Sequence, residues 1–326
     1  MKNRIFNPVL FQGKLKWKNY FEGWYFKMAG CDKESILSLI PGVSLSLHDR
    51  HCFIQYIYTH TGANENIIKT GYIRYDIEDF IFTDKPFSVK IGSSKFSLEG
   101  IEVDISGDGV SIEGRVDFLN LTPIKKSLFM PNIMGYFAYI PKMECYHGVI
   151  SMNHILSGSA KLRFNDSDAV DVDFSDGKGY IEKDWGTSFP SDYVWGQCNN
   201  FSDKNTSLMF SVANIPFAGR SFKGFLCNII VDDKEFRFAT YNKSKIVSQN
   251  VNDTEAVFVF DNRRAKVMIK LKIEKPGNLI APVSGTMERV IKEGLSGEID
   301  FILTDKLTEM EYIDSGITAG IEIVKE

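Results

Sequence analysis

The sequence lacks several features that would assign it to a common class. No stretch of its 326 residues approaches the ~18 consecutive apolar residues of a transmembrane helix. The first twenty residues, MKNRIFNPVLFQGKLKWKNY, contain no apolar core of a signal peptide. Its 38 basic and 42 acidic residues leave a net charge of -4, which argues against nucleic acid or an anionic membrane as an electrostatic partner. The five cysteines include no C-x-x-C pair, so we expect free thiols in a reducing cytoplasm.

Familiar catalytic motifs are also missing. There is no G-x-S-x-G elbow, no P-loop, no G-x-G-x-x-G and no H-E-x-x-H. The segment HDRHC, residues 48–52, contains residue types that bind metals, but no second ligand cluster accompanies it. We therefore expect neither a metal nor a cofactor.

What the sequence does contain is β-strand periodicity. Short alternating or apolar runs such as SILSLI, CFIQYIYTH, EAVFVF and AKVMIKLKIE are separated by turn signals such as HTGANEN, SGDG and VDDKE. Helical stripes are scarce, and the best candidate is the short TMERVIKEGL at 286–295. This pattern predicts an all-β chain of sandwiches or barrels.

An internal repeat divides the chain. The residues that follow Trp24 match those that follow Trp195 without a gap, at a constant offset of 171. Farther on, GRVDFL at 114–119 resembles GEIDFI at 297–302. Two matches in the same order indicate duplication of a β unit. We predict a first domain at 1–175 and a second at 176–326, with Trp24 and Trp195 in equivalent positions.

The first motif with chemical potential is NYFEGWYFK, residues 19–27. On a strand, Glu22 and Trp24 share one face, and Tyr25 lies on the other. A carboxylate flanked by aromatic rings can have a raised pKa and act as an acid. The alternative is a barrel-opening strand whose Gly-Trp pair plugs one end.

The second motif is YIEKDWGTSFPSDYVWGQCNNF, residues 180–201, which combines large aromatic residues with charges. If the chain is extended, the residues that share a face are Glu182 with Asp184, Lys183 with Trp185, and Trp195 with Gln197 and Asn199. Such a set suits a pocket that holds an apolar molecule and performs polar chemistry on it. An exposed, salt-bridged hairpin is the alternative.

The third motif is FMPNIMGYFAYIPKMECYHGVISMNH, residues 129–154. A segment so rich in methionine and aromatic residues is expected to line a core, a cavity or a lid. Glu144 and His147 lie within it and meet only if the segment turns. His147 is either part of a site or a hydrogen-bonded core residue.

These motifs resemble the tocopherol cyclase family. The similar segments are FEGWYFK, MECYHG, YIEKDWGTSFP, VWGQCN and APVSGTMERVIKEGLSGEIDF, in the same order from about Arg4 to the end of the chain. The resemblance implies two tandem lipocalin-like β-barrel halves. The chain departs from the family's pattern at Asp184, which replaces an asparagine, and at Thr187 and Ser188, which replace glycines.

The resemblance also implies a reaction. Protonation of the alkene of a prenylated quinol gives a tertiary carbocation, which the hydroxyl group traps to close a ring. This requires a shielded acid, aromatic rings and an apolar cleft. The implied catalytic candidates are Glu182, Asp184, Glu22 and His147. The implied substrate-binding residues are Trp24, Tyr25, Glu144, Lys183, Trp185, Trp195, Gln197 and Asn199.

Two other classes of function stay open on the sequence alone. One is a hydratase or cyclase that acts on a different polyene or polyketide chain. The other is a lipid- or isoprenoid-binding carrier without catalysis. In each case the expected partner is a hydrophobic small molecule, with a peripheral contact to a membrane left open as its source.

Overall fold

A computed structural model describes residues 2–62, 66–165, 167–217 and 220–325. The described residues are almost entirely β-strand, as predicted. They contain one α-helix, α1 (Lys2–Phe6), and three 3-10 turns, η1 (Ile77–Asp79), η2 (Gly135–Tyr139) and η3 (Thr240–Asn242). In these ranges no helix has the length and apolar character that crossing a bilayer requires.

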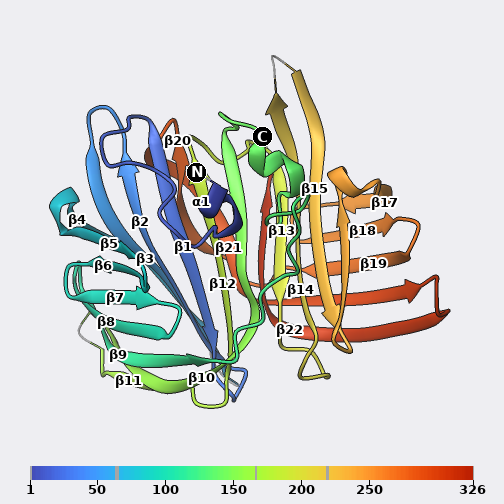
Figure 1. Cartoon of the computed structure of the whole chain (residues 1–326). Coiled ribbons are helices and arrows are strands. Elements are labelled where there is room, and N and C mark those ends of the chain that lie inside the picture. The colour runs from blue at the N-terminus through green and yellow to red at the C-terminus, as the bar shows by residue number, and fades with distance from the viewer. Residues whose placement is uncertain (1, 63–65, 166, 218–219, 326) are drawn as a thin grey trace.

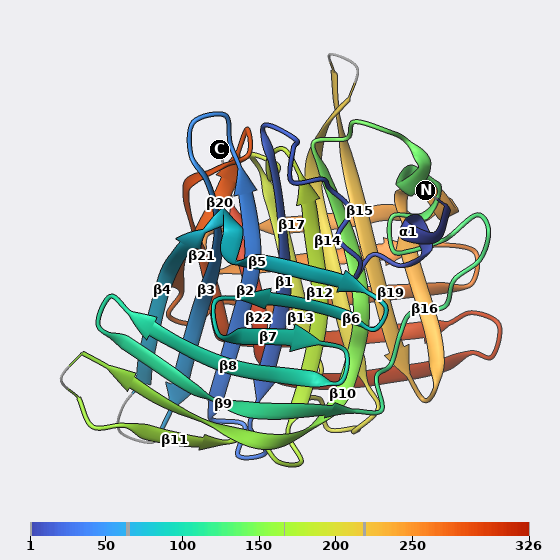
Figure 2. The ribbon, with the colours of Figure 1, turned by 60° about the vertical axis from the view of Figure 1, so that its left-hand side comes forward.

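The first half of the molecule is a 12-stranded antiparallel sheet. In spatial order its strands are β4 (Asn66–Asp76), β3 (Arg50–Thr61), β2 (Ser35–Leu45), β1 (Tyr20–Ala29), β12 (Lys178–Gly186), β10 (Cys145–Phe164), β9 (Val110–Leu119), β8 (Gly100–Gly107), β7 (Ser94–Ser97), β6 (Phe87–Ile91) and β5 (Phe80–Asp84), with β11 (Val170–Asp173) paired to β10. Figure 2 shows β5–β9 running across the front of β1–β3, so the sheet curls over on itself.

The second half is a 10-stranded antiparallel sheet that repeats this order. Its strands are β16 (Lys234–Ala239), β15 (Arg220–Val231), β14 (Ser207–Phe217), β13 (Tyr193–Cys198), β22 (Met310–Val324), β21 (Thr286–Asp305), β19 (Ala265–Lys272), β18 (Glu255–Asp261) and β17 (Lys245–Val251), with β20 (Gly277–Val283) paired to β21. The two halves stand side by side in Figure 1, the first from blue to green and the second from yellow to red.

Three hydrophobic clusters hold this arrangement together. One fills the interior of each curled sheet, and the third lies between the two halves. The halves are also joined by hydrogen bonds, since the Gln55 side-chain amide pairs with both backbone groups of Ile280 on β20. The interface is therefore a packed layer with its own polar contacts.

The predicted duplication is confirmed by the strand order, but its alignment needs correction. The offset of 171 matches Leu37 on β2 with Leu208 on β14, and both side chains face their own barrel interior. The same offset matches Trp24 with Trp195. Trp24 faces the first interior, whereas Trp195 faces the layer between the halves. Because side chains alternate along a strand, a displacement of one residue between β1 and β13 reverses the face.

Three further expectations differ from the structure. Residues 286–295, the best helical candidate, belong to strand β21, where pairing with β20 and β22 overrides local propensity. The similar segments at 114–119 and 297–302 occupy β9 and β21, which hold different places in the two strand orders. The chain also passes between the sheets after β12, later than the division predicted at 175/176, because β12 pairs with β1 and β10.

Candidate functional site

A cavity lies in the layer between the two halves. Its volume is about 160 Å³, roughly ten times what one buried water requires, so it admits an organic group. Most of its lining is apolar or aromatic, and its acidic residues are Glu182, Asp184, Glu293 and Glu322. A mostly apolar cleft with a few convergent polar groups is the usual form of a small-molecule site.

Strand alternation determines which motif residues reach this cavity. On β1 the residues Phe21, Gly23 and Tyr25 line it, while Glu22 and Trp24, which alternate with them, face the interior of the first barrel. Register then brings partners from other strands to the same face. Asp184 on β12 lies opposite Gly23 on β1 and opposite His147 on β10.

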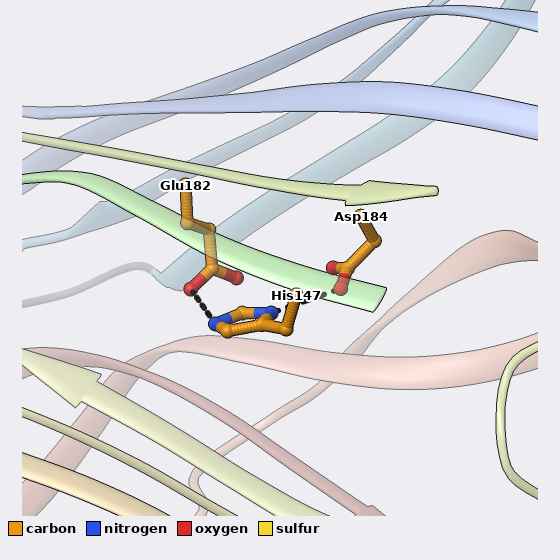
Figure 3. A group of neighbouring side chains, drawn as sticks. All are labelled: His147, Glu182 and Asp184. Carbon is orange, nitrogen blue, oxygen red and sulfur yellow. Dashed lines mark hydrogen bonds and ion pairs between the residues drawn. The ribbon is translucent and has the colours of Figure 1, made fainter. Parts of the chain in front are cut away.

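His147 is held between two carboxylates, as Figure 3 shows. Its Nδ1 lies 2.9 Å from Asp184 Oδ1, and its Nε2 lies 3.3 Å from Glu182 Oε2. The same Glu182 oxygen accepts hydrogen bonds from the Tyr180 hydroxyl at 2.6 Å and from Trp195 Nε1 at 3.3 Å. Two hydrogen-bond donors and the nearby imidazole nitrogen around one oxygen suit a charged carboxylate.

The charge state of His147 follows from these contacts. Burial by itself lowers the pKa of His147, but the charges of Asp184 and Glu182 and their hydrogen bonds outweigh it and raise that pKa well above its ordinary value. An imidazolium carries a proton on each ring nitrogen, and here Nδ1 is hydrogen-bonded to Asp184 while Nε2 lies at ion-pair distance from Glu182 without hydrogen-bond geometry. The cluster is thus a charged, internally paired wall of the cavity.

His147, Glu182 and Asp184 also have the residue types of a metal site. Their ligand atoms lie within 4.8 Å of one another. Both ring nitrogens already face carboxylates, however, and binding a cation through either one would require the imidazole to lose a proton. The absence of a metal therefore stays our prediction.

Two acidic residues of the cavity were missed by the sequence analysis. Glu293 lies on β21 and Glu322 on β22. Burial, followed by the charge of Glu182, raises the pKa of Glu293 to about 8. Burial and the neighbouring Glu293 raise the pKa of Glu322 well above its ordinary value. Glu322 has one visible signal in the sequence, as the single acid inside the apolar run AGIEIV. Glu293 has none, because it lies in the segment 286–295, for which the sequence predicts a helix.

Of the twelve residues predicted for the site, five line the cavity. They are Tyr25, His147, Glu182, Asp184 and Trp195. They come from β1, β10, β12 and β13, so segments far apart in the sequence meet there. Their contact with a substrate remains a prediction.

Four other predicted residues, Glu22, Trp24, Lys183 and Trp185, lie on the opposite face of β1 and β12, away from the cavity. Glu22 is fully buried, forms an ion pair with Lys183 and accepts hydrogen bonds from the backbone N–H groups of Gln12 and Gly13. Lys183 also donates to the carbonyls of Pro8 and Leu10, at 2.9 and 2.5 Å.

These contacts correct the predicted acid role of Glu22. It anchors the N-terminal segment inside the first barrel, as does Trp24, whose Nε1 donates to Val9 O at 2.7 Å. Lys183 lies over the rings of Trp24 and Trp185, at 4.4 and 5.2 Å from their centroids. The alternative interpretation, in which Gly23 and Trp24 together plug one end of the barrel, stays a prediction, since Gly23 lines the cavity and Trp24 faces the first interior.

The last three predicted residues also lie outside the cavity lining. Glu144 is exposed, and its backbone carbonyl accepts hydrogen bonds from the 187–188 backbone. Gln197 accepts a hydrogen bond from Lys27 Nζ at 2.8 Å. Asn199 donates to Gly179 O at 2.8 Å. Each of these interactions joins elements of the fold, so a substrate-binding role for them is not supported.

Fold and site together define a two-barrel, lipocalin-like protein with an acid-lined cavity between its halves. The profile of the family described as tocopherol cyclase-like matches residues 132–323. The chain belongs to this tocopherol cyclase-like family. A search of curated proteins gave no match.

Solved structures share the fold at low sequence identity. CghA aligns with a TM-score of 0.56 and 9% identity over 94% of this chain and 88% of its own. Kievitone hydratase from Nectria haematococca aligns with a TM-score of 0.52 and 10% identity over 93% and 88%. A protein from Nitrosomonas europaea aligns with a TM-score of 0.51 and 11% identity over 93% and 92%.

Proposed function

We propose that this protein is a cyclase that closes a ring on a prenylated quinol or a related isoprenoid by acid catalysis. The observation that carries the proposal is the cavity itself, in which a mostly apolar lining surrounds four carboxyl groups. The apolar part suits a hydrocarbon tail, and the acidic part supplies the proton and stabilises positive charge in the transition state. Membership of the tocopherol cyclase-like family supports the same reaction class.

The ring faces of Tyr25 and Trp195 would help in this reaction. Both side chains line the cavity, with ring centroids 5.7 Å apart. A carbocation formed beside them would be stabilised by their π faces, as other cations are. The ionised carboxylates beside His147 would add a fixed negative field. The reaction requires neither a metal nor a redox cofactor.

A non-catalytic carrier is a weaker explanation of the same cavity. Burying carboxyl groups costs free energy, and an apolar ligand gains nothing from them. A hydratase that adds water to a polyene is the stronger alternative, because it needs the same acid. The fold shared with kievitone hydratase is consistent with it.

One experiment separates these functions. The purified protein would be incubated with a panel of prenylated quinols and polyenes, and products would be followed by chromatography with mass detection. Ring closure gives a product of unchanged mass, whereas hydration adds the mass of one water. Mass spectrometry of lipids that copurify with the protein would identify a carrier's cargo. If no panel member changes while a lipid copurifies stoichiometrically, the cyclase proposal is wrong.

A further inference from the structure

Glu293 and Glu322 form a pair of acids that the sequence motifs do not include. They lie directly opposite each other on neighbouring strands β21 and β22. Both line the cavity, and their exposed fractions are 0% and 9%. Two ionised carboxylates in this cross-strand position would repel each other in a region of low dielectric constant. At least one of them is therefore expected to be neutral.

No cation of the described part of the chain is in direct contact with this pair. Among the described residues, neither acid forms an ion pair. The titratable groups that face Glu293 are Tyr25 and Lys27 on β1, Glu182 on β12 and Glu322 on β22. The Lys27 ammonium is directed elsewhere, to Gln197 Oε1 and to the carbonyl of Thr318.

Each acid accepts a hydrogen bond from a tyrosine, and the two acids differ in how deeply the remaining oxygen is buried. Tyr25 donates its hydroxyl proton to Glu293 Oε1 and accepts a hydrogen bond from Ser38 Oγ at 3.1 Å. The other oxygen, Glu293 Oε2, is buried without a hydrogen-bond partner among the described residues. A buried polar atom with no partner is unusual and costs free energy. Glu322 likewise accepts one hydrogen bond, from Tyr193, but its side chain is not fully enclosed, since it is 9% exposed and Glu293 is 0% exposed.

We propose that Glu293 is the acid of the cavity and that its Oε2 carries the proton which is transferred to the substrate alkene. Tyr25 holds the other oxygen and so orients the carboxyl group. This inference rests on the proposed function, which it deepens by naming the proton donor. Glu293 replaces Glu182 and Asp184 as the proposed proton donor, because both of those acids are paired with the His147 imidazolium.

The proton transfer balances without a further reactant. The Oε2–H bond breaks as a C–H bond forms at the less substituted alkene carbon, which leaves a tertiary carbocation and a Glu293 carboxylate. The hydroxyl oxygen of the quinol then attacks the cation and forms the ring C–O bond. Its proton returns to the carboxylate, so the product is an isomer of the substrate and Glu293 is regenerated.

The test compares Glu293→Gln with Glu322→Gln, Glu182→Gln and the control Glu298→Gln. Glu298 is an exposed acid on the same strand β21, outside the cavity. We expect E293Q to lose on the order of 10²–10⁴-fold in kcat with little change in substrate Kd, because an amide keeps the shape but donates no comparable acidic proton. E298Q should retain the parental rate.

A second measurement does not require turnover. Because Glu322 also contributes to any protonated carboxyl band in the infrared spectrum, the spectra are subtracted: parent minus E293Q at neutral pH should show such a band, and parent minus E298Q should not. The band should shift when a prenylated quinol is added. If E293Q cyclises the quinol at the parental rate, or if parent minus E293Q shows no protonated carboxyl band, Glu293 is not the donor. If the parent shows the band and its shift but converts no panel member, the proposed reaction fails while the protonated state of Glu293 stands.

Discussion

Replacing Glu293 by glutamine should make the folding stability of this protein less dependent on pH. Burial raises the pKa of Glu293 to about 8 from an ordinary value of 4.5. Since the folded-state pKa lies above the unfolded one, the stability linked to this group is fully present below the unfolded value. It is lost progressively as the pH rises through the folded value.

The magnitude follows from the two pKa values. Between them the folded protein binds one more proton at Glu293 than the unfolded chain does. The free energy of unfolding therefore falls by about 1.4 kcal/mol per pH unit from this group. Over the whole interval from 4.5 to about 8, the loss amounts to roughly 5 kcal/mol. Glutamine is uncharged in both states, so E293Q does not undergo this loss.

The assay is urea unfolding of the parent, E293Q and E298Q at several pH values between about 5 and 8, the interval over which the two states differ in protonation. The quantity to plot is the parent's free energy of unfolding minus the variant's. Titration of His147 occurs in both proteins and largely cancels in this difference, whereas Glu322 interacts electrostatically with Glu293, so Glu322→Gln is measured alongside. We expect a slope near -1.4 kcal/mol per pH unit for E293Q and no slope for E298Q. A flat line for E293Q would show that Glu293 is ionised in the folded protein and would refute the reasoning.

Three further predictions concern the neighbouring groups. Lys183→Met leaves Glu22 buried without its partner and should lower the free energy of unfolding by about 3–5 kcal/mol. Adding Glu22→Gln should restore much of the lost stability. A double variant as unstable as Lys183→Met alone would contradict the pairing. The pKa of His147 is raised, so its stabilisation is present below the unfolded value of about 6.5 and is lost as pH rises through the folded one. The difference in Tm between the parent and His147→Gln should accordingly shrink at alkaline pH, and a constant difference would argue against an imidazolium. Tyr25→Phe removes a hydrogen bond that lowers the pKa of Glu293, so the alkaline limb of the pH–rate profile should move to higher pH; an unmoved limb would exclude the positioning role.

The fold was largely predictable because strand alternation is a local property. Runs such as AKVMIKLKIE bury alternate residues in the structure, as the period of two predicts. The duplication was visible for a similar reason, since β2 and β14 keep their pattern at one fixed offset. The wrong prediction of a helix at 286–295 has a local cause as well. The residues of this segment favour a helix, and only its pairing partners make it a strand.

The faces of the motif strands were also predictable, but their surroundings were not. Alternation correctly separated Glu22 from Tyr25, and Lys183 from Glu182. It could not indicate that the Glu22 face would be covered by the N-terminal segment while the other face opened into a cavity. Both faces carry aromatic residues and charge, so local composition does not distinguish an ion pair inside a barrel from a substrate site.

The sequence by itself determined an all-β chain of two similar halves, its family resemblance and a set of acids on known strand faces. These features depend on residue order and on the two-residue period of the strand. Only the tertiary structure decided which acids share a cavity, because Glu182 and Glu293 approach through the packing of one sheet against the other. The protonation of each acid then depends on burial and on neighbours distant in sequence, and no local pattern contains that information.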